Sequence, residues 1–410
     1  MKHNIQSLIN NLNDNLDENI FNQKENNMRL NIIDTVILLI SQEDFKILDY
    51  EVFCPSARGI FEPPYYKLSK GSFNCIQYPT KQDLITGNYK PRLTLSKRLV
   101  CGGYSIALKI EFSAPKLLFG NNFEELENNN FEAVILKLHQ KLEEMGILID
   151  VEKLKFAQVT GVHFGKNIIL KNATSSLVIN TIKKLDISRR LDSGDTDYRN
   201  EGQAIRYHTN SYELTFYDKM KDLEQAKITE KRATEKDNLI QLELFTKEEI
   251  LKNEVLRMEV RLNTKKKLRE IFIKNNYNLK NPTFHSIFNV ELSRLILNYF
   301  WQEYIVPSLN IVLLAKESPD VLYHKAKSID ITENKTLQIV GALQLINDCG
   351  CRRLKSFLSA PVFYRLKQDI ERFEVVDNYL YSVFKSVQTN IQSNNRCKID
   401  DLYFYAKCKA

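Results

Sequence analysis

Alternating apolar and polar residues predict a strand in the middle of the chain that ends at a tyrosine. Over Ser211–Tyr217, apolar side chains occupy every second position, which places Tyr217 on the polar face. Ala204–His208 predicts a second strand, and the turn-forming residues between the two indicate a β-hairpin. Asp218 then follows as an N-cap for a charged, helical connection over residues 219–250. We therefore expect Tyr217 on an open face, where a strand meets a helix.

Further strands are predicted on both sides of this hairpin. Their polar faces carry Glu111 in the strand after Tyr104, His163 in Lys155–Phe164, and Glu259 in Val255–Leu262. Gly165 to Asn167 is expected to close the His163 strand. The remaining elements predicted in this half are strands at residues 32–40, 45–52 and 91–95 and helices at residues 131–145 and 175–185.

Beyond residue 283, helical spacing replaces strand alternation. Helices are predicted at residues 284–304, 318–327, 334–348, 352–358 and 362–373. Gly350 separates two of them, so this pair forms either a helix-turn-helix or an ordinary helix packing. The pattern predicts an α+β fold with a central antiparallel sheet, helices on one face and a mainly helical C-terminal domain. We expect a polar leader at 1–27, a domain built on the central sheet at 28–270 and a helical accessory domain at 271–410.

Composition narrows the function classes. The chain has 410 residues, 43% of them hydrophobic, which suffices for one large or two ordinary cores. Its formal net charge of +7 favours an anionic partner. No apolar run reaches the roughly 18 residues that span a bilayer, so we expect no membrane association. The seven cysteines are odd in number and have no zinc-ligand spacing, so we expect reduced thiols. The amino terminus lacks the apolar core of a signal peptide, so we expect a cytoplasmic protein.

Three polar-face residues and one tyrosine suggest a phosphodiester chemistry. If their strands share one sheet, Glu111, His163 and Glu259 converge near Tyr217. Two carboxylates and an imidazole suit Mg²⁺ or Mn²⁺, which would activate a phenol that is almost fully protonated at neutral pH. Lys219 is placed to stabilise the phosphoryl intermediate. Each of these residues taken alone is also compatible with an ordinary solvated strand position.

The tyrosine segment resembles that of the filamentous-phage gene II and plasmid rolling-circle replication initiators. The resemblance rests on Tyr217-Asp218-Lys219 with Leu223-Glu224, and on supporting blocks at residues 32–36, 109–122 and 256–262. It covers roughly residues 30–270, although Gly161-Val162-His163 stands where related sequences carry Arg-x-Asp, and no His-hydrophobic-His motif is present.

This resemblance implies a nickase-ligase that cuts one origin strand and stays attached through a 5′-phosphotyrosine. The implied partners are single-stranded or supercoiled origin DNA of a phage or plasmid, together with a host helicase and polymerase. Candidate DNA contacts are the basic residues Lys116, Arg206, Arg257, Arg261, Lys265, Lys266, Lys267, Arg352 and Arg353.

Two alternatives remain on sequence grounds. A mobilisation relaxase or tyrosine transposase would use similar chemistry, and a non-catalytic origin- or RNA-binding protein could share the sheet. Trapping a covalent protein–DNA adduct separates the enzymes from the binder.

Overall fold

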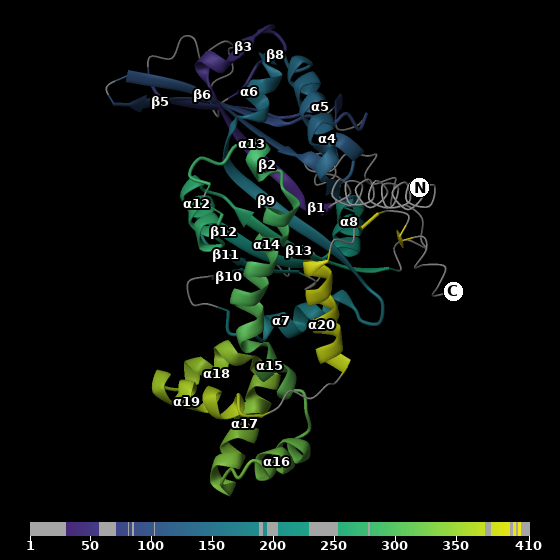
Figure 1. The fold of residues 1–410 in the computed structure, drawn as a ribbon, viewed down its shortest axis with the longest axis vertical. Coiled ribbons are helices and arrows are strands. Elements are labelled where there is room, and N and C mark those ends of the chain that lie inside the picture. Colours follow the sequence, from purple (N-terminus) through teal and green to yellow (C-terminus); the bar gives the residue numbers. More distant parts are fainter. Residues whose placement is uncertain are drawn as a thin grey trace, which may run out of the picture.

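The chain folds around a nine-stranded sheet in which every neighbouring pair of strands is antiparallel (Figure 1). The computed structural model describes residues 30–56, 71–80, 82–83, 86–101, 103–187, 192–194, 204–228, 253–277, 279–373, 379–393, 397–398 and 401–402. In spatial order the strands are β10 (Asp192–Gly194), β11 (Ala204–His208), β12 (Tyr212–Asp218), β13 (Glu254–Leu262), β9 (Gln158–Leu170), β2 (Ile33–Ser41), β6 (Gly103–Ser113), β5 (Arg92–Val100) and β4 (Phe73–Gln77). The α+β class predicted from the sequence is confirmed.

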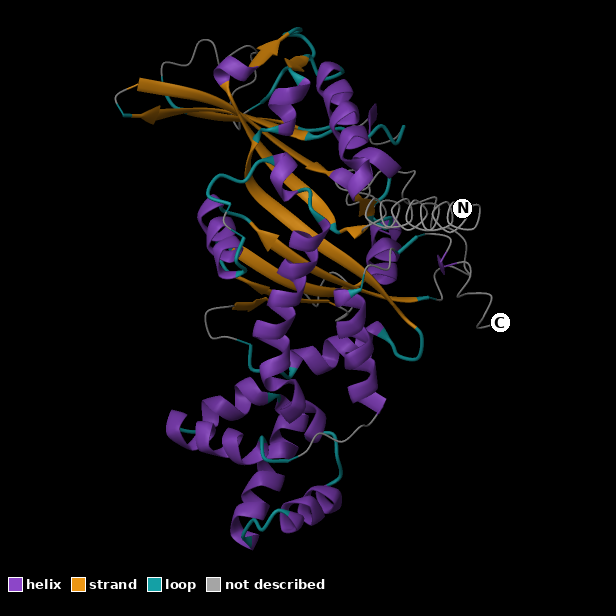
Figure 2. Ribbon diagram, viewed as in Figure 1, coloured by secondary structure: helices purple, strands orange, loops and turns teal. Residues whose placement is uncertain are grey.

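Helices and two small ribbons complete the fold (Figure 2). The ribbons pair β1 (Leu30–Asn31) with β7 (Leu126–Glu127) and β3 (Phe45–Ile47) with β8 (Ile147–Ile149). The helices are α4 (Ala114–Phe119), α5 (Phe131–Glu143), α6 (Val151–Lys155), α7 (Ser175–Lys183), α8 (Lys219–Ile228), α12 (Lys265–Lys274), α13 (Phe284–Ile287), α14 (Val290–Phe300), α15 (Val306–Leu314), α16 (Pro319–Ser328), α17 (Glu333–Cys349), α18 (Cys351–Phe357), α19 (Ala360–Ile370) and α20 (Tyr379–Gln392).

One face of the sheet is apolar and carries the core. Leu214, Phe216 and Met258 are fully buried there, and α12 and α14 contact the sheet across the same core. An aromatic contact joins distant segments, since the rings of Phe112 and Phe284 lie 5.7 Å apart. Burial of these aromatic side chains removes a large apolar area from water, which is the dominant favourable term in folding.

The opposite face is polar and partly covered at its β12–β13 end, where Tyr217 and Arg261 keep some exposure to solvent while Arg257 and Glu259 are buried. The register aligns Tyr217 with Arg257, and through Arg257 with Asn167 on β9. Helix α8 follows Tyr217 directly and packs over this end through a small apolar cluster that includes Met220 and Phe123. Tyr217 is half-buried, because α8 and the segment around Phe123 cover part of this face.

The C-terminal helices form the end of the molecule farthest from the β5–β6 hairpin (Figure 1). Gly350 joins α17 to α18 with a positive φ of 83°, and the amide of Cys351 donates to the carbonyl of Lys184 at 2.8 Å. The Lys355 ammonium pairs with Asp186 at 2.5 Å. The turn between α17 and α18 is thus attached to the segment that follows α7. The predicted helix-turn-helix function of this helix pair stays a prediction.

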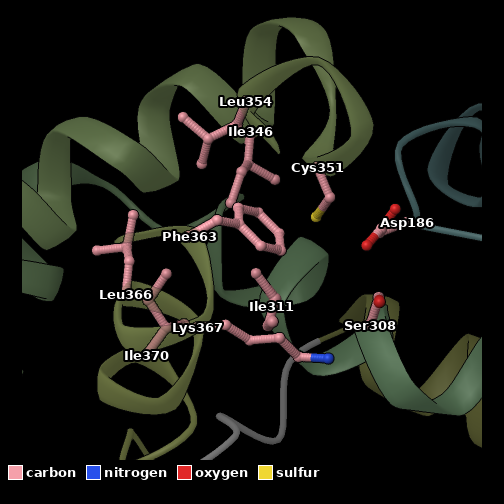
Figure 3. A pocket seen from close by; sticks show the side chains of 10 residues that line it. All are labelled: Asp186, Ser308, Ile311, Ile346, Cys351, Leu354, Phe363, Leu366, Lys367 and Ile370. Atoms are coloured by element: carbon pink, nitrogen blue, oxygen red, sulfur yellow. The ribbon is translucent and has the colours of Figure 1, made fainter. Parts of the chain in front are cut away.

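A small pocket lies between that segment and the C-terminal helices (Figure 3). Its lining is mainly apolar, with Asp186, Ser308 and Lys367 at its edge. Tyr217, His163 and Glu259 take no part in it.

Several predicted boundaries shift in the structure. Strand β9 continues through Gly165 to Leu170, whereas the sequence placed its end near Gly165. The predicted strand at 45–52 ends at Ile47, and the predicted helix at 284–304 is divided into α13, α14 and a π-helix at Trp301–Ile305. Helix α20 was not predicted. The predicted leader and the residues after α8 up to 252 lie outside the described residues.

The boundary predicted near 270–283 stays a prediction. Helix α14 contacts β13 and β9, and α20 contacts β9, so part of the C-terminal half shares the core of the sheet. Within the described ranges, no helix is long and apolar enough to cross a membrane.

Candidate active site

The Tyr217 hydroxyl faces a buried carboxylate. The hydroxyl donates a hydrogen bond to Oε2 of Glu259 at 3.4 Å. Tyr217 is the second-last residue of β12, just before α8 begins. Asp218 fixes this junction, because its Oδ1 accepts from the amides of Met220 at 2.9 Å and Lys221 at 3.0 Å, as the N-cap prediction required. The side chain of Tyr217 is therefore held where the chain direction changes.

The two neighbouring tyrosines lie on the other face. Tyr212 is buried against Phe300 at a ring separation of 5.8 Å, and its hydroxyl lies 3.1 Å from that of Tyr304. Tyr207 is also buried and donates to the carbonyl of Ile182 at 3.2 Å. The alternation that puts Tyr217 on the polar face puts Tyr212 on the apolar face, and its ring is packed in the core.

Glu259 lies at the centre of a charged cluster. It is 3% exposed, and its Oε1 accepts from Nε of Arg261 at 2.9 Å and lies 3.9 Å from Nδ1 of His163. Arg257 Nε lies 4.0 Å from Oε2. Burial raises the pKa of Glu259, but the positive charges of Arg261 and Arg257, with His163, outweigh burial and lower that pKa to about 2. Glu259 is therefore an anion at neutral pH.

Arg257 is buried, and both of its Nη atoms are hydrogen-bonded, whereas its buried Nε has no hydrogen-bond partner among the described residues. Its Nη2 donates to Asp34 at 2.7 Å, and its Nη1 donates to Asn167 Oδ1 at 3.0 Å and to the carbonyl of Asn122 at 3.2 Å. Asp34 in turn accepts from the Ser113 hydroxyl at 3.0 Å. Breaking one partner of such a buried pair costs about 3 to 5 kcal/mol, because the other charge is left uncompensated.

The environment of Tyr217 keeps its hydroxyl protonated. Burial raises the pKa of Tyr217 well above its ordinary value, Arg257 lowers it, and the negative charge of Glu259 raises it again. Lys219 lies close by, with Nζ 6.0 Å from the centre of the tyrosine ring and 2.9 Å from Oδ1 of Asn122. The phenol thus has an acceptor and nearby cations but is neutral at rest.

The predicted three-ligand metal site is only partly assembled. His163 and Glu259 are neighbours, but Glu111 lies on β6, three strands from β13, and its carboxylate pairs with Arg92 at 2.5 Å and Lys109 at 3.7 Å. Three strand spacings put the two glutamate backbones roughly 14 Å apart or more. Across the described ranges, no group of three or more His, Cys, Asp or Glu side chains is placed to hold one ion.

The predicted DNA contacts are dispersed. Arg261 borders the Tyr217 cluster with a side chain 36% exposed, whereas Arg257 is buried within it. Arg206 pairs in register with Thr215, the strand neighbour of Glu259. The others are Lys116, buried on α4; Lys265, Lys266 and Lys267 on α12, where Lys267 Nζ lies 4.5 Å from the Tyr212 ring; and Arg352 and Arg353 on α18.

Sequence reasoning missed the residues that hold Arg257. Asp34 is the one charged residue in the mainly apolar run Ile32–Ile40, and that interruption was an available signal. Asn122 belongs to a loop and Asn167 to a segment that resembled a turn, so neither was expected to contact a strand arginine. The hydrogen bond between Asn167 and Arg257 can be recognised only once β9 and β13 are known to be neighbouring strands.

No family model, curated protein or solved structure matches this chain. A neutral phenol, an anionic acceptor 3.4 Å away and arginine and lysine side chains around them form a set suited to nucleophilic attack on an anionic ester.

Proposed function

We propose that this protein is a tyrosine-dependent single-strand DNA endonuclease and strand transferase of the type that initiates rolling-circle replication. The observation that carries the proposal is the hydrogen bond from Tyr217 to Glu259, in a cluster that also contains Arg257 and Arg261. The +7 charge and the resemblance of residues 30–270 to the gene II type of initiator support DNA as the substrate.

In the proposed reaction, Tyr217 Oη attacks the scissile phosphorus. The Oη–P bond forms, the bond from phosphorus to the 3′ oxygen breaks, and the phenolic proton passes to Glu259. The upstream strand leaves as a 3′-alkoxide that takes a proton from water, and the downstream strand stays on the protein as a 5′-phosphotyrosine. Attack by a 3′-hydroxyl on the same phosphorus reverses the step and rejoins the strand.

Arg261 and Lys219 are the cations that would stabilise the charged phosphoryl group. Arg261 is the more exposed of the two arginines beside Glu259, so an incoming phosphate oxygen reaches it first. Charge-assisted hydrogen bonds of this kind are about twice as strong as neutral ones. Arg257 is a positioning residue, since its three hydrogen bonds hold it behind Glu259.

His163 and Glu259 are the side chains that would hold Mg²⁺ or Mn²⁺. Burial lowers the pKa of His163, so the imidazole is neutral at pH 7 and has a lone pair for an ion. Mg²⁺ commonly binds through one or two protein ligands, with water and substrate phosphates completing its shell. Such an ion would polarise the phosphodiester and lower the barrier to attack.

The proposal is tested by trapping the covalent intermediate. A pool of random-sequence single-stranded oligonucleotides labelled at the 3′ end is incubated with the protein and resolved on a denaturing gel. We expect labelled protein, because the 3′ label stays on the strand that becomes linked through its 5′ phosphate. A 5′ label on the same pool is expected to leave the protein unlabelled.

Two variants locate the nucleophile. Tyr217→Phe removes one hydroxyl while keeping the ring, so the fold is retained and the adduct is lost. Tyr212→Phe is the matched control on the same strand and keeps the adduct. Adduct formation by Tyr217→Phe at the wild-type rate would refute this assignment, and no adduct from any variant or from wild type would favour the non-catalytic binding protein. A mobilisation relaxase would give the same adduct and is distinguished by the replicon it acts on.

A further inference from the structure

The β5–β6 hairpin extends beyond the rest of the sheet. Strand β4 pairs with β5 only from Leu93 to Lys97, so Arg98–Val100 and Gly103–Ser105 continue as a two-stranded ribbon that no third strand joins among the residues the structure describes. Figure 1 and Figure 2 show this distal part projecting at the upper left, away from the helices.

The projecting part carries large apolar side chains that nothing in the described structure covers. Leu99 is 64% exposed and Val100 is 54% exposed, although Leu93 and Leu95 on the same strand are buried. Tyr104, opposite Leu99 in the register, is 49% exposed, and Lys97 Nζ lies 4.6 Å from the centre of its ring. Exposed apolar groups gathered at one projecting point mark an interaction site.

The charge of the distal part of the hairpin is positive. Lys97 and Arg98 are the charged residues between Leu93 and Leu108, whereas Arg92 and Lys109 pair with Glu111 at the base of the hairpin. Arg98 points to the same face of the sheet as Arg92, six residues before it, because side chains alternate along a strand. The same alternation, carried across the registers, puts Arg98 on the side of the sheet that bears Tyr217 and Glu259, and Lys97, Leu99 and Tyr104 on the other face of the ribbon.

We propose that the tip of the β5–β6 hairpin binds duplex DNA beside the strand that Tyr217 cleaves. The major groove of B-DNA admits a two-stranded β-ribbon, Lys97 and Arg98 would contact phosphates, and Leu99 and Tyr104 would contact base edges or sugars. This inference rests on the proposed function for the identity of the cleaved strand but not for duplex binding itself.

The distance between the two sites sets the length of DNA required. Five strand spacings separate β12 from β5 and about 14 residue positions separate the level of Tyr217 from the hairpin tip, so the two lie roughly 50 Å apart. At about 3.4 Å per base pair, this corresponds to about 15 base pairs of duplex. A shorter duplex arm does not reach the tip.

The test uses the Tyr217→Phe protein, which binds DNA without cleaving it. Its probes are fluorescent substrates with a random single-stranded segment joined to a duplex arm of about 5 or about 30 base pairs, chosen to fall short of or exceed the expected reach. We expect Lys97→Glu/Arg98→Glu to weaken binding to the long arm about tenfold or more and to reduce the slope of log affinity against log salt by about two. Binding to the short arm is expected to stay unchanged.

Two further variants complete the design. Arg365→Glu/Lys385→Glu changes charge equally at two exposed positions on α19 and α20 and is expected to keep long-arm affinity. Leu99→Ser/Tyr104→Ser is expected to weaken long-arm binding without changing the salt slope. All these positions are surface sites, so thermal melting of each variant should match that of the parent.

Several outcomes would overturn the inference. These are unchanged long-arm affinity in the Lys97/Arg98 variant, an equal loss on both arms, or a Leu99/Tyr104 variant that instead loses self-association or binding to anionic vesicles. If wild-type protein binds DNA in the arm-dependent way but forms no tyrosine adduct, the proposed function is refuted and the hairpin inference is not. The reason is that arm-dependent binding is measured without cleavage. The tip variants carrying Tyr217 should still form the adduct on single-stranded DNA.

Discussion

Gly165 controls the position of the buried arginine, and its replacement gives a direct test of the site. In register, Gly165 lies opposite Glu259. A Cβ at this position would lie 2.5 Å from Nη2 and 2.9 Å from Cζ of Arg257. The guanidinium has no free direction in which to retreat without giving up its bond to Asp34 or Asn167. Gly165→Ala therefore forces Arg257 to move.

The cost can be worked from the contacts that are lost. A hydrogen bond involving a charged group contributes about 1.5 to 3 kcal/mol, so losing the Asp34 contact should lower the free energy of unfolding by about 2 to 3 kcal/mol. Arg257 also lowers the pKa of Tyr217, and one pKa unit corresponds to about 1.4 kcal/mol. We therefore expect adduct formation by Gly165→Ala to slow about tenfold or more.

The assay is urea denaturation at pH 7 in a double-mutant cycle with Arg257→Met. If Gly165→Ala acts by displacing the guanidinium, its cost should fall by at least about 1 kcal/mol in the Arg257→Met background. Gly103→Ala is the control, because a Cβ there meets nothing within 4 Å. An equal cost of Gly165→Ala in both backgrounds would show that backbone effects dominate and that the reasoning is wrong.

Two further predictions concern the ionisation and the metal requirement of the cluster. The pKa of Glu259 is lowered from 4.5 to about 2 in the folded protein, so Glu259 contributes about 3 kcal/mol of stability above pH 4.5 that is lost as pH falls through 2. The difference in urea stability between wild type and Glu259→Gln should thus shrink by about 2 kcal/mol between pH 7 and pH 3, and a pH-independent difference contradicts the linkage. Chelation by EDTA should abolish nicking, Mg²⁺ or Mn²⁺ should restore it, and His163→Ala should raise the Mg²⁺ concentration needed; undiminished nicking in EDTA contradicts a metal requirement.

Period-2 alternation predicted β11, β12 and β13 well because apolar residues occupy one face of each strand and polar residues the other. The bounds of β11 match the prediction, and those of β12 and β13 differ by one residue. The same rule failed on β9, where Gly165-Lys166-Asn167 has the composition of a turn. In the structure that glycine leaves room for Arg257, and Asn167 accepts a hydrogen bond from it, so a tertiary contact explains residues that local propensity assigned to a loop.

Alternation gives the face of a side chain but not the order of the strands in the sheet. That is why Glu111, His163 and Glu259 were expected together while Glu111 lies on a strand three places from β13. Polarity also gives no measure of burial: Glu259 and Arg257 lie on the polar face yet are buried. The cover comes from α8 and the Asn122 loop, which are distant in sequence from β13.

In the proposed reaction, arrival of the phosphate would itself activate the base. With its pKa near 2, Glu259 is a poor acceptor for the proton of Tyr217, whose own pKa is raised by burial. Much of that low pKa comes from Arg261, which is also the cation within reach of an incoming phosphodiester. A phosphate that draws Arg261 toward itself removes a positive charge from Glu259 and raises the pKa of Glu259. Substrate binding and proton acceptance are then coupled through one arginine, and Tyr217 stays protonated until a strand is in place.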